Sequence, residues 1–179
     1  MDHEEIPQGH FLFTSEGVTC GHPDKLCDII SDSVLDACLT VDPKAKVACE
    51  TAAKGNLVMV FGEVTLNGDI NTEQIVRKAI KEVGYDSVET GMDYKTATVI
   101  VALDQQSIQI AQSVHIDKAP EEIGAGDQGL MIGYAADETE ELMPLSVSFC
   151  NALVRRLEEC RYSNILSWLR PDGKVQVTV

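Results

Sequence analysis

The five residues Gly21–Lys25 fix where the first long helix of this chain begins. Pro23 suits the first helical turn, because its missing N–H costs nothing there and its φ angle is already helical. Apolar residues then recur at three- and four-residue spacing, as Leu26, Ile30, Val34, Ala37 and Cys38. The sequence therefore predicts an amphipathic helix over roughly residues 23–40.

The same five residues place a histidine, a carboxylate and an ammonium at the start of that helix. Unpaired N–H groups and the positive end of the helix dipole favour bound anions there, phosphates above all. Lys25 adds positive charge, Asp24 offers an oxygen ligand for Mg²⁺, and His22 can donate a hydrogen bond to a leaving oxygen. An ordinary capped helix with a solvated first turn explains these residues equally well.

Apolar and β-branched runs predict strands over Phe11–Ser15, Lys46–Thr51, Leu57–Thr65, Thr96–Leu103, Gly129–Ala136 and Val175–Val179. The predicted hairpin connection is Lys54-Gly55-Asn56. A second helix is predicted between the N-cap Asn71 and Gly84, and a third from Pro144 to about Cys160. This order favours an α+β fold with helices on one sheet face. We expect no partner for the last strand, so that the chain stops in mid-domain.

The net charge of −15 argues against nucleic acids and anionic membranes as main partners, because phosphate groups need a basic surface. The six cysteines contain no C-x-x-C pair. We see no signal peptide and no long apolar stretch. These features predict a cytoplasmic chain with reduced thiols.

Further motifs accompany the helix start: Phe11–Glu16, Val47–Thr51, Phe61–Glu63, Gln105–Ser107, Gly124–Leu130 and Trp168–Thr178. In this order and at these separations, the set resembles the amino-terminal portion of the methionine adenosyltransferase (S-adenosylmethionine synthetase) family, in a eukaryote-like form. The resemblance implies a fold of similarly built sheet-plus-helix domains. The implied parts are a polar tail (1–10), an N-terminal domain (11–105), a flexible active-site loop (106–123) and the start of a truncated central domain (124–179).

The resemblance also implies the reaction. The methionine sulfur attacks the 5′ carbon of ATP, which forms S-adenosylmethionine, and the triphosphate is released as phosphate and diphosphate. The family's cofactors are Mg²⁺ and K⁺. A thioether has no proton to remove, so catalysis is expected to rest on alignment and on neutralising the leaving triphosphate.

The resemblance assigns roles to individual residues of this sequence. His22 matches the catalytic, ATP-contacting histidine beside the leaving oxygen. Glu16 and Asp24 match the family's magnesium-binding carboxylates, and Glu50 matches the carboxylate that holds a potassium ion.

The remaining matches concern the substrates. Glu63 and Gln106 match the methionine-binding pair. Asp172 and Lys174 match ATP contacts, and Asp127 matches an adenosine- or methionine-side contact that we assign to ATP. Each has a plainer explanation, since Asp172, for example, lies in an ordinary Pro-Asp-Gly turn.

The sequence departs from the family pattern at several positions, among them Cys20, where a glutamate is expected, and Ile108, where a proline is expected. Family members are longer, so we expect the chain alone to be inactive. The expected partners are further copies (a dimer or tetramer) or a full-length synthetase. A catalytically silent paralogue that regulates or supports a full-length synthetase remains the alternative, and an isolated nucleotide-binding module is a third interpretation.

Overall fold

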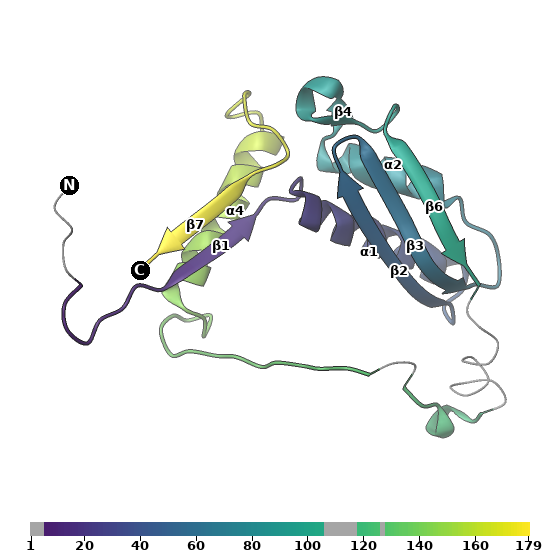
Figure 1. The fold of residues 1–179 in the computed structure, drawn as a ribbon, viewed down its shortest axis with the longest axis horizontal. Coiled ribbons are helices and arrows are strands. Elements are labelled where there is room, and N and C mark those ends of the chain that lie inside the picture. The colour runs from purple at the N-terminus through teal and green to yellow at the C-terminus, as the bar shows by residue number, and fades with distance from the viewer. Residues whose placement is uncertain (1–5, 106–117, 126–127) are drawn as a thin grey trace. The chain divides into compact units, whose positions relative to one another are not determined.

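The computed structural model describes residues 6–105, 118–125 and 128–179, and it divides into two compact units (Figure 1). Met1–His22 and Gly133–Val179 form one unit, here called the terminal unit. Pro23–Ile132 forms the other, here called the sheet unit.

A three-stranded sheet in the order β2-β3-β6 is the centre of the sheet unit. β2 (Lys46–Lys54) and β3 (Leu57–Thr65) form the predicted antiparallel hairpin, and β6 (Thr98–Asp104) lies parallel to β3. Val58 and Val60 are fully buried on one face of β3. The short elements β4 (Asp86–Ser87), η1 (Val88–Thr90), β5 (Met92–Asp93) and η2 (Pro120–Glu122) also belong to this unit.

Helices α1 (Pro23–Val41) and α2 (Thr72–Val83) cover that buried face (Figure 1). The predicted apolar stripe of α1 is confirmed, since its buried residues are Leu26, Ile30, Val34 and Cys38. Asn71 caps α2, because its side-chain oxygen accepts the Gln74 N–H at 3.0 Å. Gly84 ends α2 in the left-handed region at φ 107°, as glycine does at many helix ends.

The terminal unit pairs β1 (Thr14–Val18) with β7 (Lys174–Thr178) in an antiparallel ribbon. Helix α4 (Leu145–Tyr162) packs on one face of this ribbon. Hydrogen bonds between side chains of α4 and Ser15 help attach α4 to β1. The Ser15 and Ser146 hydroxyls are 2.8 Å apart, and the Cys150 thiol donates to the Ser15 carbonyl at 3.1 Å.

The α+β class is confirmed, but two expectations about strands are wrong. The last strand has a partner, because β7 pairs with β1. In this pairing Thr14 lies opposite Thr178, which is 164 positions further along the chain. Residues 129–136 form no strand. Leu130, Met131 and Ile132 are 86, 89 and 87% exposed, and an apolar run without a ladder partner has no reason to hold an extended strand.

Residues 106–117 of the expected active-site loop, and residues 1–5 of the expected tail, lie outside the described residues. None of the described helices is long and apolar enough to cross a membrane.

Gly62 in β3 permits a close approach of two strands. Its φ is +132°, and a Cβ there would lie 2.1 Å from the Ala48 carbonyl oxygen. We expect Gly62→Ala to lower the free energy of unfolding by about 2–3 kcal/mol, from strain and steric overlap together. Urea unfolding followed by circular dichroism measures this loss.

Gly55→Ala is the matched control, because Gly55 has φ +59° with nothing within 4 Å of its added Cβ. It should cost only about 1 kcal/mol of left-handed strain. Equal losses in the two variants would contradict the steric argument.

Candidate functional site

The boundary between the two units falls inside the Gly21–Lys25 motif, because His22 ends one segment of the terminal unit and Pro23 begins the sheet unit. The terminal unit holds the predicted residues Glu16, His22, Asp172 and Lys174. The sheet unit holds Asp24, Lys25, Glu50 and Glu63. Gln106 and Asp127 lie outside the described residues.

In the terminal unit, the turn Thr19–His22 is hydrogen-bonded to the segment Pro171–Gly173. The buried Thr19 hydroxyl donates to the Pro171 carbonyl at 2.7 Å and to the Gly173 carbonyl at 3.2 Å. The Thr19 N–H donates to Gly173 at 2.9 Å. Both accepting residues flank Asp172. The structure therefore brings the two predicted ATP-contact segments together.

Gly21 makes this contact sterically feasible. Its N–H donates to the Pro171 carbonyl at 3.2 Å, and a Cβ at this position would lie 2.2 Å from the Pro171 carbonyl carbon. Backbone approach at this distance excludes every residue with a side chain. The His22 N–H in turn donates to the Thr19 carbonyl at 3.0 Å, which closes the turn just before α1.

Glu16 and Lys174 form an ion pair across the ribbon. Lys174 Nζ lies 2.7 Å from Glu16 Oε2, and both side chains are about half exposed. A pair this exposed contributes about 0–1 kcal/mol to stability. Breaking this pair therefore costs little. The Glu16 carboxylate could then bind a cation and the Lys174 ammonium a phosphate.

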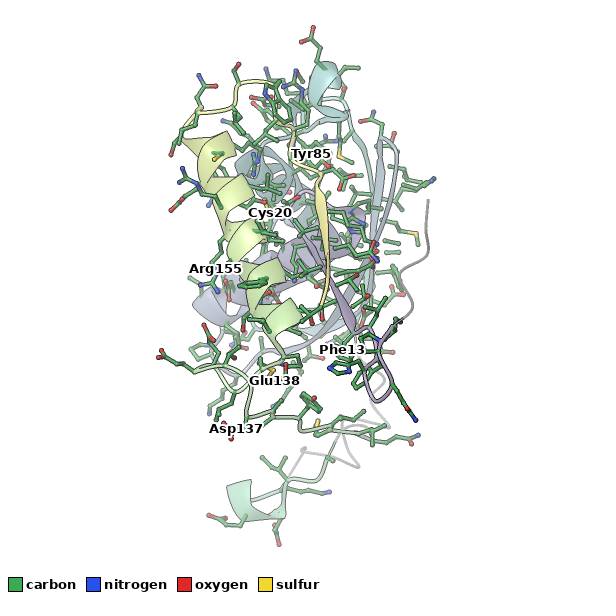
Figure 2. All side chains as sticks on the ribbon, turned by 90° about the vertical axis from the view of Figure 1, so that its left-hand side faces the viewer. Phe13, Cys20, Tyr85, Asp137, Glu138 and Arg155 are labelled. Carbon is green, nitrogen blue, oxygen red and sulfur yellow. The ribbon has the colours of Figure 1, made fainter. Side chains whose placement is uncertain are left out.

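A cluster from α4 lies against the other side of the same turn. Glu158 Oε1 accepts the Cys20 N–H at 2.8 Å, and Arg161 donates to the Cys20 sulfur at 3.2 Å. Figure 2 shows Cys20 beside α4. Burial raises the pKa of the Cys20 thiol above its ordinary value, although the Tyr162 hydroxyl and the Arg161 charge oppose this.

Sequence reasoning missed Glu158 and Arg161. Their spacing along α4 is a possible signal for an ion pair, since residues three apart on a helix are neighbours. However, Arg156 and Glu159 have the same spacing and form an exposed pair at 2.6 Å. Spacing alone does not separate the pair that contacts the turn from the pair that faces solvent.

In the sheet unit, Glu50 and Glu63 lie on the sheet face opposite the helices. Glu50 is in register with Phe61 and Glu63 with Ala48, so the two carboxylates are diagonal neighbours on adjacent strands. Glu63 is also in register with Asp104 on β6, a residue the sequence analysis did not single out. Neighbouring carboxylates repel, so this end of the face favours a bound cation or ammonium group.

Two further predicted residues, Asp24 and Lys25, are exposed in the first turn of α1. Within the ranges that the structure describes, no group of three or more His, Cys, Asp or Glu side chains could hold a metal ion. Glu16 and Asp24, the predicted magnesium ligands, belong to different units. Each unit therefore holds one of these two predicted ligands.

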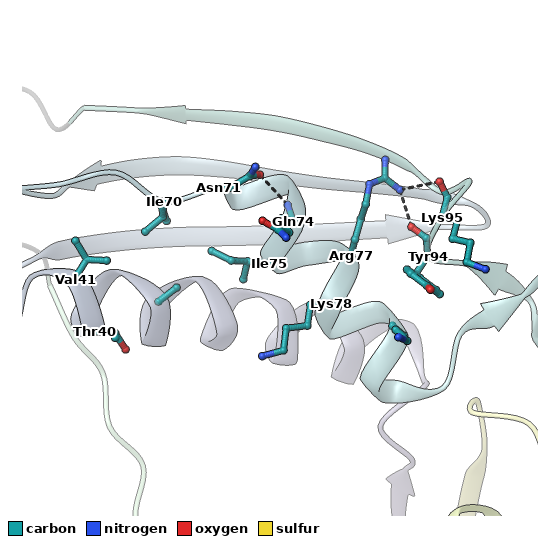
Figure 3. A pocket seen from close by; sticks show the side chains of 12 residues that line it. Thr40, Val41, Ile70, Asn71, Gln74, Ile75, Arg77, Lys78, Tyr94 and Lys95 are labelled. Atoms are coloured by element: carbon teal, nitrogen blue, oxygen red, sulfur yellow. Dashed lines mark hydrogen bonds between the residues drawn. The ribbon is translucent and has the colours of Figure 1, made fainter.

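A groove of about 770 Å³ lies along α1 and α2 (Figure 3). Its lining includes Val41, Ile75 and Lys78, and it contains none of the predicted site residues. At its edge, Arg77 donates to the Tyr94 carbonyl at 2.7 Å and to the Ala97 carbonyl at 3.1 Å. This arginine ties α2 to the segment before β6.

Comparison with known families gives two matches. Residues 10–108 match the family described as S-adenosylmethionine synthetase, N-terminal domain. Residues 122–179 match the family described as S-adenosylmethionine synthetase, central domain. The two matches together span most of the chain and agree with the resemblance found in the sequence.

The Thr19 hydroxyl should contribute measurably to the stability of the terminal unit. Thr19→Val keeps the side-chain shape but leaves the Pro171 and Gly173 carbonyls without this donor. We expect a loss of about 1–3 kcal/mol in the free energy of unfolding. The measurement is urea unfolding followed by fluorescence of Trp168, the single tryptophan, which lies in the terminal unit.

Thr14→Val is the matched control. Thr14 lies on the same ribbon, and its hydroxyl contacts the Thr178 hydroxyl at 2.9 Å in an exposed position. This variant should change stability by less than about 0.5 kcal/mol. A similar loss in both variants would show that the Thr19 bonds have no special role.

Proposed function

Because this chain belongs to the S-adenosylmethionine synthetase family, we propose that it binds ATP and L-methionine for transfer of the adenosyl group to the methionine sulfur. The observation that carries the proposal is the hydrogen-bonded contact between the turn Thr19–His22 and the segment Pro171–Gly173. We further propose that the two domains comprise residues 11–105 and 124–179. The proposed location of the chain is the cytoplasm.

The chemistry sets what the site must do. Sulfur attacks the 5′ carbon with a lone pair, the C–O bond to the triphosphate breaks, and the triphosphate takes the electron pair. No base is needed, because the thioether carries no proton. The rate therefore depends on holding sulfur and carbon in line and on stabilising the negative charge that grows on the leaving oxygen.

On the ATP side, His22 would donate to the leaving oxygen and Lys174 would neutralise phosphate charge. Asp172 and Asp127 would orient the nucleotide. The family uses divalent and monovalent cations. Here Glu16 and Asp24 would hold Mg²⁺, which neutralises triphosphate charge when bound.

On the methionine side, the Glu63 carboxylate would bind the ammonium group and the Gln106 amide the amino-acid end. Glu50 would hold K⁺. The diagonal placement of Glu50 and Glu63, with Asp104 beside Glu63, supports a cation-binding role for this end of the sheet face.

Binding and turnover are tested separately, because the expectation that the lone chain is inactive stays a prediction. Calorimetry measures binding of ATP in the presence of Mg²⁺, and chromatography measures S-adenosylmethionine formed from ATP and L-methionine with Mg²⁺ and K⁺. Product above a no-enzyme control would contradict the expected inactivity and support adenosyl transfer by this chain alone. Absence of any ATP binding would overturn the proposal.

His22→Ala should weaken binding of tripolyphosphate, the leaving group, more than binding of ATP. A hydrogen bond to the new anionic oxygen of tripolyphosphate is stronger than one to the ester oxygen of ATP. We expect the tripolyphosphate Kd to rise about 10–100-fold and the ATP Kd by less than about tenfold. Calorimetry with each ligand in the presence of Mg²⁺ measures both constants.

His10→Ala is the control, because His10 is an exposed histidine in the same unit outside the motif. It should leave both constants unchanged. If His22→Ala weakens ATP and tripolyphosphate equally, then His22 serves ground-state binding and not the developing charge.

A second observation bears on the partners of the chain, which are further copies or, in the alternative interpretation, a full-length synthetase. The family commonly forms oligomers, and the sheet face opposite α1 and α2 exposes apolar side chains of Leu57, Phe61 and Ile100. Exposed apolar patches on sheets mark surfaces that bind other proteins. We propose that this face binds a second copy of the chain or a full-length synthetase.

Phe61→Lys should disrupt this association. A lysine at position 61 would lie opposite Glu50 on the neighbouring strand, so β3 should tolerate the change. The exposed face would at the same time lose its central aromatic group. We expect light scattering to give an oligomer for the unmodified chain and a monomer for Phe61→Lys. Val88→Lys, at an exposed apolar residue in η1, is the control and should keep the oligomer. A monomeric unmodified chain that ignores added full-length synthetase would contradict the proposal.

A further inference from the structure

Helix α4 carries a partly buried ion pair within its last two turns. Arg161 Nη2 lies 2.7 Å from Glu158 Oε2, and the two side chains are 11 and 19% exposed. The other carboxylate oxygen, Oε1, accepts the Cys20 N–H at 2.8 Å. Both oxygens of Glu158 are thus engaged, one by the guanidinium and one by the backbone of the turn Thr19–His22.

Arg161 also contacts Cys20, through the cysteine side chain. It donates to the Cys20 sulfur at 3.2 Å, and its guanidinium lies over the Tyr162 ring at 4.0 Å. The Tyr162 hydroxyl is 3.5 Å from the same sulfur. The backbone and the side chain of Cys20 are therefore both held by α4.

A second pair on α4 shows what an ion pair without this contact looks like. Arg156 and Glu159 lie 2.6 Å apart with 62 and 65% of their side chains exposed. Water screens such a pair, so the pair adds little to the stability of the folded chain. The Glu158 carboxylate is largely removed from water. Its hydrogen bond to the part-buried Cys20 N–H is therefore stronger than an exposed one, and its loss leaves that donor without this acceptor.

The turn is thus fixed from two sides. Thr19 and Gly21 are bonded to Pro171–Gly173, and Cys20, which lies between them, is bonded to α4. His22 follows directly, and its N–H closes the turn on Thr19. Losing the α4 side would leave the turn held only by its bonds to Pro171–Gly173, so the backbone just before His22 would be less tightly fixed.

We propose that the Glu158–Arg161 pair positions the turn Thr19–His22, and through it the His22 side chain for its contact with the triphosphate. The first part stands on the contacts of the terminal unit, whereas the second rests on the function proposed above. Glu158 and Arg161 are positioning residues, since they contact Cys20 in the turn and would act on His22 only through it.

The test compares three variants of the full chain. Glu158→Ala removes both contacts of the carboxylate. Glu158→Gln keeps an acceptor for the Cys20 N–H but loses the charge that binds Arg161. Glu159→Gln is the matched control, because it makes the same chemical change one residue further along the same helix, in the exposed pair.

The first measurement is local and needs no ligand. We expect hydrogen exchange of the Cys20 amide, followed by NMR, to speed up about 10–100-fold in Glu158→Ala, corresponding to a lost charged hydrogen bond. Glu158→Gln should recover part of the protection, and Glu159→Gln should match the unmodified chain. Unchanged protection of the β7 amides separates this effect from unfolding of the whole unit.

The second measurement is binding of tripolyphosphate in the presence of Mg²⁺ by calorimetry. We expect about a tenfold loss of affinity in Glu158→Ala, from misplacement of His22, with partial rescue in Glu158→Gln. If the unmodified chain binds neither ATP nor tripolyphosphate, the proposed function fails, and the exchange data still decide whether the pair holds the turn.

Two results would overturn the inference. Unchanged Cys20 exchange in folded Glu158→Ala would show that the pair does not hold the turn. Faster exchange with unchanged tripolyphosphate affinity would show a purely structural contact. If Glu158→Ala does not fold, Glu158→Gln and Arg161→Lys take its place, with the same two readouts.

Discussion

The antiparallel pairing of β1 with β7 is the constraint on which the candidate site depends. It places Val18 opposite Lys174, so the turn that follows β1 meets the segment that precedes β7. The Thr19 and Gly21 bonds to Pro171 and Gly173 continue this pairing beyond the ribbon. Helix α4 then adds the contacts to Cys20 from one face.

Local signals in the sequence predicted local structure well. Pro23 marks the start of α1, and Asn71 and Gly84 mark the ends of α2, because each acts through its own backbone preference. The partner of β7 was not predictable in this way, because strand pairing over such a separation leaves no local pattern. The site residues came from motifs, whereas Glu158 and Asp104 act through tertiary neighbours and were missed. All of the site assignments stay predictions, and Gln106 and Asp127 lie outside the described residues.

Charge balance is the main physical demand on the proposed site. The chain has a net charge of −15, and in the terminal unit Lys174 is already paired with Glu16. Asp172 adds a further negative charge beside the same turn. Of the predicted residues in this unit, a bound triphosphate would therefore meet two carboxylates, one lysine and His22. Like charges brought close together are unfavourable without a cation between them. The proposed use of Mg²⁺ follows from this balance as much as from the family.

The pairing of β1 with β7 also affects the order of folding. The β2–β3 hairpin closes over a short turn at Gly55, but Thr14 and Thr178 meet across 164 residues. Closing so long a loop costs entropy before any contact rewards it, whereas the hairpin is nearly free of that cost. The sheet unit can therefore form early during synthesis, while β1, although made first, must wait for β7. The turn that carries His22 would then be among the last parts of the protein to acquire its final form.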